Sequence, residues 1–149
     1  MSPPGVRVRP GRVLGLDLGD VRIGVAISDD DRRLAVPVGT LRTGAPQDLR
    51  AVARLVEEHG VTLIVVGHPL SMSGRPGPQA ALAEQFADAL RSFLSVPVAM
   101  QDERLSTAEA DRSLERAGAR GRERRSVVDQ TAAAVILQAW LDANRPRKR

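Results

Sequence analysis

An acidic residue inside an apolar segment constrains the fold of this chain more than any other feature. Residues 13–18 read VLGLDL, a pattern typical of a core strand, and Asp17 interrupts it just before Gly19. A carboxylate in a buried strand costs free energy unless it is paired or holds a metal ion. The fold must therefore place something that stabilises negative charge beside the end of this strand.

Hydrophobic periodicity divides the chain into strands and helices. We expect strands at residues 12–18, 22–28, 34–41, 61–66 and 96–101, helices at 46–59, 79–94 and 126–143, and a short helix that a capping box opens at Ser106. The short link at 19–21 predicts a hairpin, and Pro37 predicts an edge position for the third strand. The alternation of later strands with helices predicts a parallel sheet, to which the opening strands add an antiparallel part.

The helix at 79–94 has a predicted inward face that contains its largest apolar residues. These are Leu82, Phe86, Ala89, Leu90 and Phe93. We expect this face to pack against the sheet.

The length of 149 residues allows one domain with its own core. We expect a disordered arm at 1–11, the domain at 12–143 and a basic tail at 144–149. The absence of Cys excludes disulfides, thiolate metal sites and a Cys nucleophile. No apolar run reaches membrane-spanning length and the N-terminus lacks a signal-peptide core, so we expect a cytoplasmic protein without membrane contact.

The basic residues are unevenly distributed and almost all are arginine. Of 22 basic residues only Lys148 is a lysine, and the formal net charge is +4. Arginines crowd the segment 116–125, where residues 118–125 are expected to form a loop, and the tail is basic as well. Arginine suits bidentate contacts with phosphate, so we predict nucleic-acid binding by Arg104, Arg122, Arg124 and Arg125. The alternative is a solvated arginine surface without a partner.

Two further carboxylates stand in positions similar to that of Asp17. Glu103 follows the apolar strand at 96–101, and Asp129 shares a predicted helix face with Ala132 and Ala133. If that face packs on the sheet, the three acids converge, and carboxylate oxygens are preferred ligands of Mg²⁺ and Mn²⁺. The alternatives are a turn cap for Asp17, an ion pair with Arg104 for Glu103 and a helix N-terminal role for Asp129.

The loop at 67–78 follows the central strand and contains His68. Its glycines permit close approach of the backbone to a phosphate, but it lacks the Gly-Lys-Ser/Thr sequence of a P-loop. The loop is either a phosphate-binding element or a turn-rich connector. Whether His68 takes part in chemistry is left open.

Four segments of the chain resemble the YqgF family, also called RuvX, of the RNase H-like superfamily. They are GLDLG at 15–19 with RIGVAISD at 22–29, GHPLSMSG at 67–74 with Gly77-Pro78, DERLSTAEA at 102–110, and VDQTAA at 128–133 followed by Ile136, Leu137, Gln138, Leu141 and Asp142. Together they extend over about residues 12–142 in the family's order. The chain departs from the family at His68, where an apolar residue is more frequent, and at Ser106, where Thr is common.

The resemblance implies an α/β RNase H-like fold, a five-stranded mixed sheet with helices on both faces. It implies that Asp17, Glu103 and Asp129 are the catalytic, metal-binding residues, with Mg²⁺ or Mn²⁺ as cofactor. The expected function is a metal-dependent nuclease that processes pre-16S ribosomal RNA, active as a monomer or homodimer.

Three other functions stay open at this point. Within the same chemistry, the substrate could be a four-way DNA junction, since the family is also named Holliday junction resolvase. GLDLG also resembles the phosphate loop of actin-like and sugar-kinase ATPases, although those proteins need two such domains and this chain has one. Finally, the fold could serve as a non-catalytic RNA- or ribosome-binding module.

Overall fold

Five strands form one mixed sheet in the computed structural model, which describes residues 10–104 and 122–145 and, for residues 122–130, the backbone only. The strands are β1 (Arg12–Leu18), β2 (Arg22–Ser28), β3 (Ala35–Arg42), β4 (Val61–His68) and β5 (Val98–Asp102), in the spatial order β3-β2-β1-β4-β5. β1 pairs antiparallel with β2 and parallel with β4, and β5 extends the parallel part. The predicted mixed sheet is confirmed, and so is the edge position of the strand that contains Pro37.

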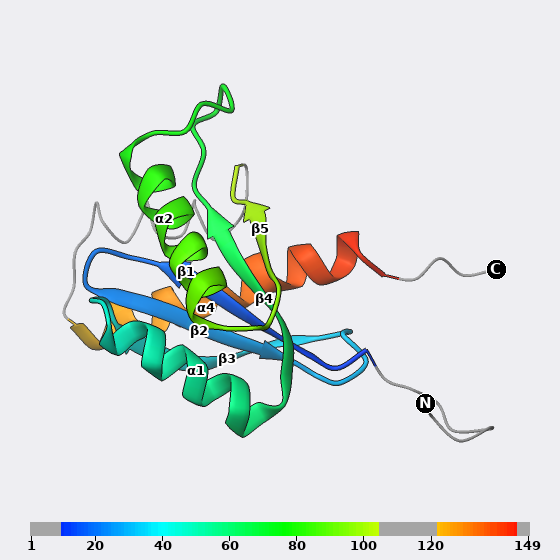
Figure 1. The fold of residues 1–149 in the computed structure, drawn as a ribbon. Helices are drawn as coiled ribbons and strands as arrows, with labels where there is room; N and C mark the ends of the chain where they lie inside the picture. The colour runs from blue at the N-terminus through cyan, green and yellow to red at the C-terminus, as the bar shows by residue number, and fades with distance from the viewer. Residues whose placement is uncertain (1–9, 105–121, 146–149) are drawn as a thin grey trace, which may run out of the picture.

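Helices cover both faces of this sheet (Figure 1). They are α1 (Gln47–His59), α2 (Pro78–Phe93) and α4 (Arg122–Ala143). α1 and α2 lie on one face, and α4 crosses β1, β2 and β3 on the other (Figure 1). In the part of the chain that the structure describes, none of the helices is both long and apolar enough to cross a membrane.

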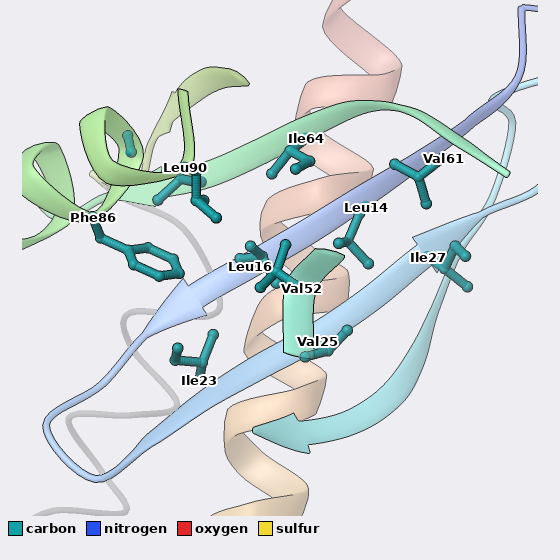
Figure 2. Packing of buried hydrophobic residues seen from close by; sticks show 12 residues of the cluster. Leu14, Leu16, Ile23, Val25, Ile27, Val52, Val61, Ile64, Phe86 and Leu90 are labelled. Atoms are coloured by element: carbon teal, nitrogen blue, oxygen red, sulfur yellow. The ribbon is translucent and has the colours of Figure 1, made fainter. Parts of the chain in front are cut away.

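The main hydrophobic cluster fills the space between the sheet and the α1–α2 layer (Figure 2). Leu14 and Leu16 of β1 contribute to it, together with Ile23, Val25 and Ile27 of β2. Residues that alternate with these point to the other face, where Val13, Ala26 and Val65 pack against Leu137 and Leu141 of α4. Pleat alternation therefore assigns each strand residue to an α1–α2 face or an α4 face.

The inward face of α2 differs from the predicted one. Leu82 and Phe93 are 49% and 48% exposed, whereas the buried residues are Ala80, Ala83, Phe86, Ala87 and Leu90. Phe86 and Leu90 are thus buried as predicted. Three alanines complete the contact stripe and allow the helix axis to approach the sheet closely, which leaves Leu82 and Phe93 outside it.

The last helix begins four residues before the predicted Ser126. Arg122, Arg124 and Arg125 therefore lie in the first turns of α4, and the prediction that they belong to a loop is wrong. Arg and Glu are good helix formers, so the segment continues the helix without needing Ser126 as its cap. The predicted helix at Ser106 lies outside the described residues.

Polar contacts fix the C-terminal half of α4 against the turn between β2 and β3. The Gln138 side chain accepts a hydrogen bond from the Ala35 amide (2.9 Å) and donates one to the Arg33 carbonyl (2.9 Å). The guanidinium of Arg32 lies 6.0 Å from the centre of the Trp140 ring and donates to the Gly11 carbonyl (3.0 Å). These contacts place the end of α4 at the start of β1, so the helix runs antiparallel to that strand.

The predicted domain limits stay predictions. Gly11, which we assigned to the arm, donates a hydrogen bond to the Asp30 carbonyl (3.0 Å). Residues 1–9 and 146–149 lie outside the described residues.

Two glycines of the first sequence motif allow close backbone approaches. A Cβ atom on Gly15 would lie 2.7 Å from Cβ of Leu137, so α4 contacts the sheet at this residue. A Cβ atom on Gly19 would lie 2.6 Å from the carbonyl oxygen of Arg22, which accepts a hydrogen bond from the Gly19 amide (2.9 Å). The first glycine sets the distance of the helix from the sheet, and the second closes the hairpin.

We predict that Gly15→Ala lowers the free energy of unfolding by about 1–3 kcal/mol, because the new methyl group collides with the base of a helix side chain and α4 must move. Urea denaturation measures this change. Gly77→Ala is the matched control, since an added Cβ there meets no atom within 4 Å. The control should lose less than about 1 kcal/mol, mainly through its N-cap position. Equal losses in the two variants would contradict a steric role for Gly15.

Candidate active site

Asp17 lies on the α4 face of the sheet near the end of β1. Its neighbour Leu16 belongs to the α1–α2 cluster, whereas Gly15 contacts Leu137 of α4, so the alternation of β1 points Asp17 toward α4. The residue is only 3% exposed. Asp17 is therefore an acid buried in a core strand, as its apolar neighbours in the sequence predicted.

Glu103 lies on the same face of the sheet as Asp17, but it approaches from the β5 side. It directly follows β5, it is 2% exposed, and its amide donates a hydrogen bond to the His68 carbonyl (3.1 Å). Its carboxylate lies over Gly67 of β4, since a Cβ atom on that glycine would be 2.6 Å from Oε2 of Glu103. Because residue 67 is a glycine, it leaves the space that the Glu103 carboxylate occupies.

Strand register brings the two acids to the same level of the sheet. Leu16 of β1 pairs with Val66 of β4. Asp17 and Gly67 are each one residue further along, on adjacent parallel strands about 4.8 Å apart. The structure therefore brings Asp17 next to the glycine over which Glu103 lies.

Helix α4 carries Asp129 toward this edge. Leu137 lies over Gly15, and a helix rises about 1.5 Å per residue against about 3.3 Å in a strand. Because α4 runs antiparallel to β1, the buried Ala132 and Ala133 fall near the level of Asp17, and Asp129 lies about one turn beyond them on the same helical stripe. The side chain of Asp129 is outside the described set, so the structure gives its place along the helix only.

Arg104 forms a hydrogen-bonded ion pair with Asp102 rather than standing alone. Its amide donates to Oδ1 of Asp102 (2.8 Å) and its Nε to Oδ2 (2.7 Å). The side-chain hydrogen bond from Arg104 holds the pKa of Asp102 below its ordinary value and raises the pKa of Arg104. A Cβ atom on Gly74 would lie 2.9 Å from one terminal guanidinium nitrogen, so Arg104 contacts the loop between β4 and α2.

His68 lies on the opposite face of the sheet from the two carboxylates. It alternates with Gly67 and shares the α1–α2 face with Val66, and its Nε2 is 3.0 Å from Oε1 of Glu84 on α2. The geometry indicates that His68 holds α2 against the end of β4.

Gly67 is the site residue whose role the sequence did not reveal. The sequence predicts that the glycines of residues 67–78 make room for a phosphate, whereas Gly67 makes room for a carboxylate of the same chain. The available signal was a glycine at the end of an apolar strand, where a larger residue would be expected.

The arrangement suits a hard divalent cation. Carboxylate oxygens are the ligands that Mg²⁺ and Mn²⁺ prefer. The Glu103 carboxylate lies over Gly67, in a space that the methyl group of an alanine would fill. Among the side chains that the structure describes, no group of three or more His, Asp or Glu residues could hold a metal ion. Asp17 and Glu103 therefore offer two ligands, and α4 approaches the same place with Asp129.

Comparisons with known proteins assign the chain to a family. The model of the RuvX family, described as Holliday junction resolvase, matches residues 11–143. A protein of Chloroflexus aurantiacus (strain J-10-fl), which carries the name of a pre-16S rRNA nuclease, is 48% identical over 136 residues, covering 89% of this chain and 88% of the relative. A protein of the same name from Anaeromyxobacter dehalogenans (strain 2CP-C) is 49% identical, covering 91% and 99%.

Solved structures show the same fold at low identity. Thermus thermophilus RuvC in complex with a Holliday junction substrate matches with a TM-score of 0.56 and 14% identity, covering 89% of this chain and 94% of that chain. RuvC from the same organism in a second structure gives a TM-score of 0.52 at 13% identity. This likeness confirms the RNase H-like fold expected from the sequence.

We predict that Gly67→Ala weakens divalent-cation binding by about tenfold or more while the protein stays folded. The new methyl group would overlap the Glu103 carboxylate and approach Cδ1 of Ile136 (3.0 Å), and both are the ends of flexible side chains that can move aside. Calorimetric titration with Mn²⁺ measures the affinity. Urea denaturation of the same protein should show a smaller loss than Gly15→Ala, and an unchanged Mn²⁺ affinity would contradict the role assigned to Gly67.

Proposed function

The chain belongs to the RuvX family, and we propose that it is a divalent-metal-dependent nuclease whose substrate is the precursor of 16S ribosomal RNA. The observation that carries the chemistry is the pair of buried carboxylates, Asp17 and Glu103, brought to one level of the sheet beside a glycine that makes room for the Glu103 side chain. The names of the relatives support the choice of substrate. Such a function fits a bacterial cytoplasmic protein.

The proposed roles follow from position. Asp17 is central because it stands on β1, between the neighbouring strands β2 and β4. Glu103 approaches from the β5 side, and we assign the third acidic position to Asp129 on α4. Bound Mg²⁺ or Mn²⁺ would activate a water molecule and neutralise the charge that develops on the phosphate. The chain's own part would be to position the buried carboxylates and to exclude bulk water with the α4 layer.

Arginines around the carboxylates would bind the phosphate backbone. Arg104 lies one residue after Glu103 and is held against the loop at 69–77 by Asp102. Arg122, Arg124 and Arg125 lie at the start of α4, which is the end of the helix nearest to Asp17 and Glu103. We assign these four arginines to nucleic-acid binding.

Branched DNA is the second candidate substrate, since the family is described as Holliday junction resolvase. A panel of labelled substrates separates the candidates: precursor 16S rRNA, single-stranded and duplex RNA, and four-way DNA junctions, each with and without Mn²⁺. Preferential cleavage of the precursor supports our proposal, and preferential cleavage of junctions contradicts it. No cleavage of any substrate would favour a non-catalytic RNA-binding module.

We predict that Asp17→Asn and Glu103→Gln each lower cleavage by at least about 100-fold, because an amide is a poor ligand for a hard cation. Both variants should stay folded, since each replaces a carboxylate with an amide of nearly the same size. Chelation of divalent metal should abolish wild-type cleavage, and added Mg²⁺ or Mn²⁺ should restore it.

Glu84→Gln is the matched control for these two variants. Glu84 lies on α2 near the end of β4, and it pairs with His68 on the face of the sheet opposite to Asp17 and Glu103. It should retain wild-type cleavage. Full activity of Asp17→Asn would remove that residue from the mechanism.

We predict that changing Arg122, Arg124 and Arg125 together to Ala weakens RNA binding and reduces its dependence on salt. On a single strand, each lost phosphate contact should lower the slope of log affinity against log salt by about 0.7. Alanine is the best helix former, so α4 should be retained. Fluorescence anisotropy at several salt concentrations measures the slope, and a chain truncated after Asn144 controls for the basic tail. A slope equal to that of the wild type would assign these arginines to the solvated surface.

A further inference from the structure

The loop between β4 and α2, residues 69–77, presents an apolar side chain at the end of the sheet that carries the two buried acids. Met72 of this loop is 70% exposed. The loop extends beyond the ends of β4 and β5 (Figure 1), and binding sites of parallel sheets form beyond the carboxyl ends of the strands. A large apolar side chain is therefore exposed at the same end of the sheet as the proposed catalytic residues.

Hydrogen bonds close the tip of the loop into a turn. The Ser71 amide donates to the Arg75 carbonyl (3.0 Å), and the Arg75 amide donates to Oγ of Ser71 (3.1 Å). The Gly74 amide donates to the Ser71 carbonyl (2.8 Å), and the φ angle of Gly74 is +85°, a conformation that favours glycine. Met72 therefore lies on a closed turn, so binding there requires little further ordering of the backbone.

The loop is joined to the strand ends through two contacts. The carbonyl of His68 accepts hydrogen bonds from the amides of both Leu70 (3.0 Å) and Glu103 (3.1 Å). Further along the loop, Gly74 contacts the guanidinium of Arg104. The loop is therefore held against the segment that carries one of the two acids.

The chain has no aromatic side chain that could take the place of Met72. Its three aromatic residues are Phe86, Phe93 and Trp140. Phe86 is buried in the main cluster, and Phe93 is the last residue of α2, at the end of the helix remote from the loop. Trp140 packs with Arg32 at the opposite end of the sheet. Contact with the face of a nucleobase, which aromatic residues make in many proteins that bind single strands, is left to an aliphatic side chain.

The composition of the loop favours a nucleic acid over a protein as the partner of Met72. The loop contains no acidic residue, and its one charged residue, Arg75, is exposed. An apolar side chain beside a cation suits a strand in which bases and phosphates alternate. Methionine is flexible and polarizable, and it is one of the apolar residues that insert between unstacked bases. Val21 is also exposed at this end, on the β1–β2 hairpin, but its short branched side chain cannot adapt in this way.

We propose that Met72 contacts the face of an unpaired base next to the scissile phosphate, while Arg75 binds the adjoining backbone. A base inside a regular duplex has both faces covered by its neighbours, so this contact requires a single-stranded or unstacked nucleotide. The substrate class is therefore RNA that is unpaired at the cleavage position. This inference rests on the proposed nuclease function, and it adds the local structure of the substrate.

Met72→Ser in an Asp17→Asn background tests the proposal, because the second substitution prevents cleavage during a binding measurement. The probe is a fluorescein-labelled single-stranded fragment of precursor 16S rRNA, titrated in Mg²⁺ at several salt concentrations. The affinity should fall about fivefold to tenfold. The slope of log affinity against log salt should stay unchanged, because no phosphate contact is lost.

Two further variants of the loop should behave differently from Met72→Ser. Met72→Trp should bind the same RNA more tightly than the parent, because an indole ring offers a larger face to a base. Arg75→Gln should lower the salt slope by about 0.7, as expected for one lost phosphate contact on a single strand.

Two controls separate a base contact from general effects. Leu34→Ser is the matched variant, since Leu34 is 66% exposed and precedes β3 at the opposite end of the sheet. It should leave the affinity unchanged. The second control is a fully paired duplex of the same RNA sequence, on which Met72→Ser should cause no loss. Urea denaturation should show equal stability for Met72→Ser and its parent, because the side chain is exposed.

The possible results separate this inference from the proposed function. Equal effects of Met72→Ser and Leu34→Ser, equal losses on the single strand and the duplex, or a lower salt slope in Met72→Ser would each overturn the base contact, while wild-type cleavage would leave the nuclease function intact. A wild-type chain that neither binds nor cleaves the RNA would overturn both.

Discussion

The close contact of α4 with the sheet is the constraint on which the rest of the structure depends. Gly15 lets the helix backbone approach β1, and Gly67 opens the space in which Glu103 is buried. The same helix closes the second hydrophobic cluster over Val13, Ala26 and Val65. Core packing and the acidic site therefore share one interface, and an error in the helix position would affect both.

Much of the fold was predictable from local pattern. The first two strands have the predicted limits, because apolar alternation and the short hairpin link leave one register that buries the apolar face. The predicted start of α4 is wrong, and the predicted contact stripe of α2 is right for Phe86 and Leu90 but wrong for Leu82 and Phe93. In α2 the packing distance decides which residues are buried, rather than side-chain size, and in α4 helix propensity decides where the helix begins, rather than a cap residue.

The site was predictable in part for a similar reason. An acid in a buried strand is visible in a sequence, so Asp17 and Glu103 could be selected and the structure places them on one face. The role of Gly67 depends on a side chain from a different strand, and the face on which His68 lies depends on the register of β4 with its neighbours. Neither relation is encoded in the spacing of residues along the chain.

The alternation that separates the two faces also limits how such a sheet can change in evolution. Asp17 and Gly67 face α4 only because Leu16 and Val66 face the opposite cluster. Insertion or deletion of one residue within β1 would turn Asp17 into the aliphatic layer. The same change within β4 would turn Gly67, which makes room for Glu103, into that layer. Substitutions can accumulate along these strands one at a time, but changes in strand length cannot, so length variation in descendants of this chain should be confined to its connections.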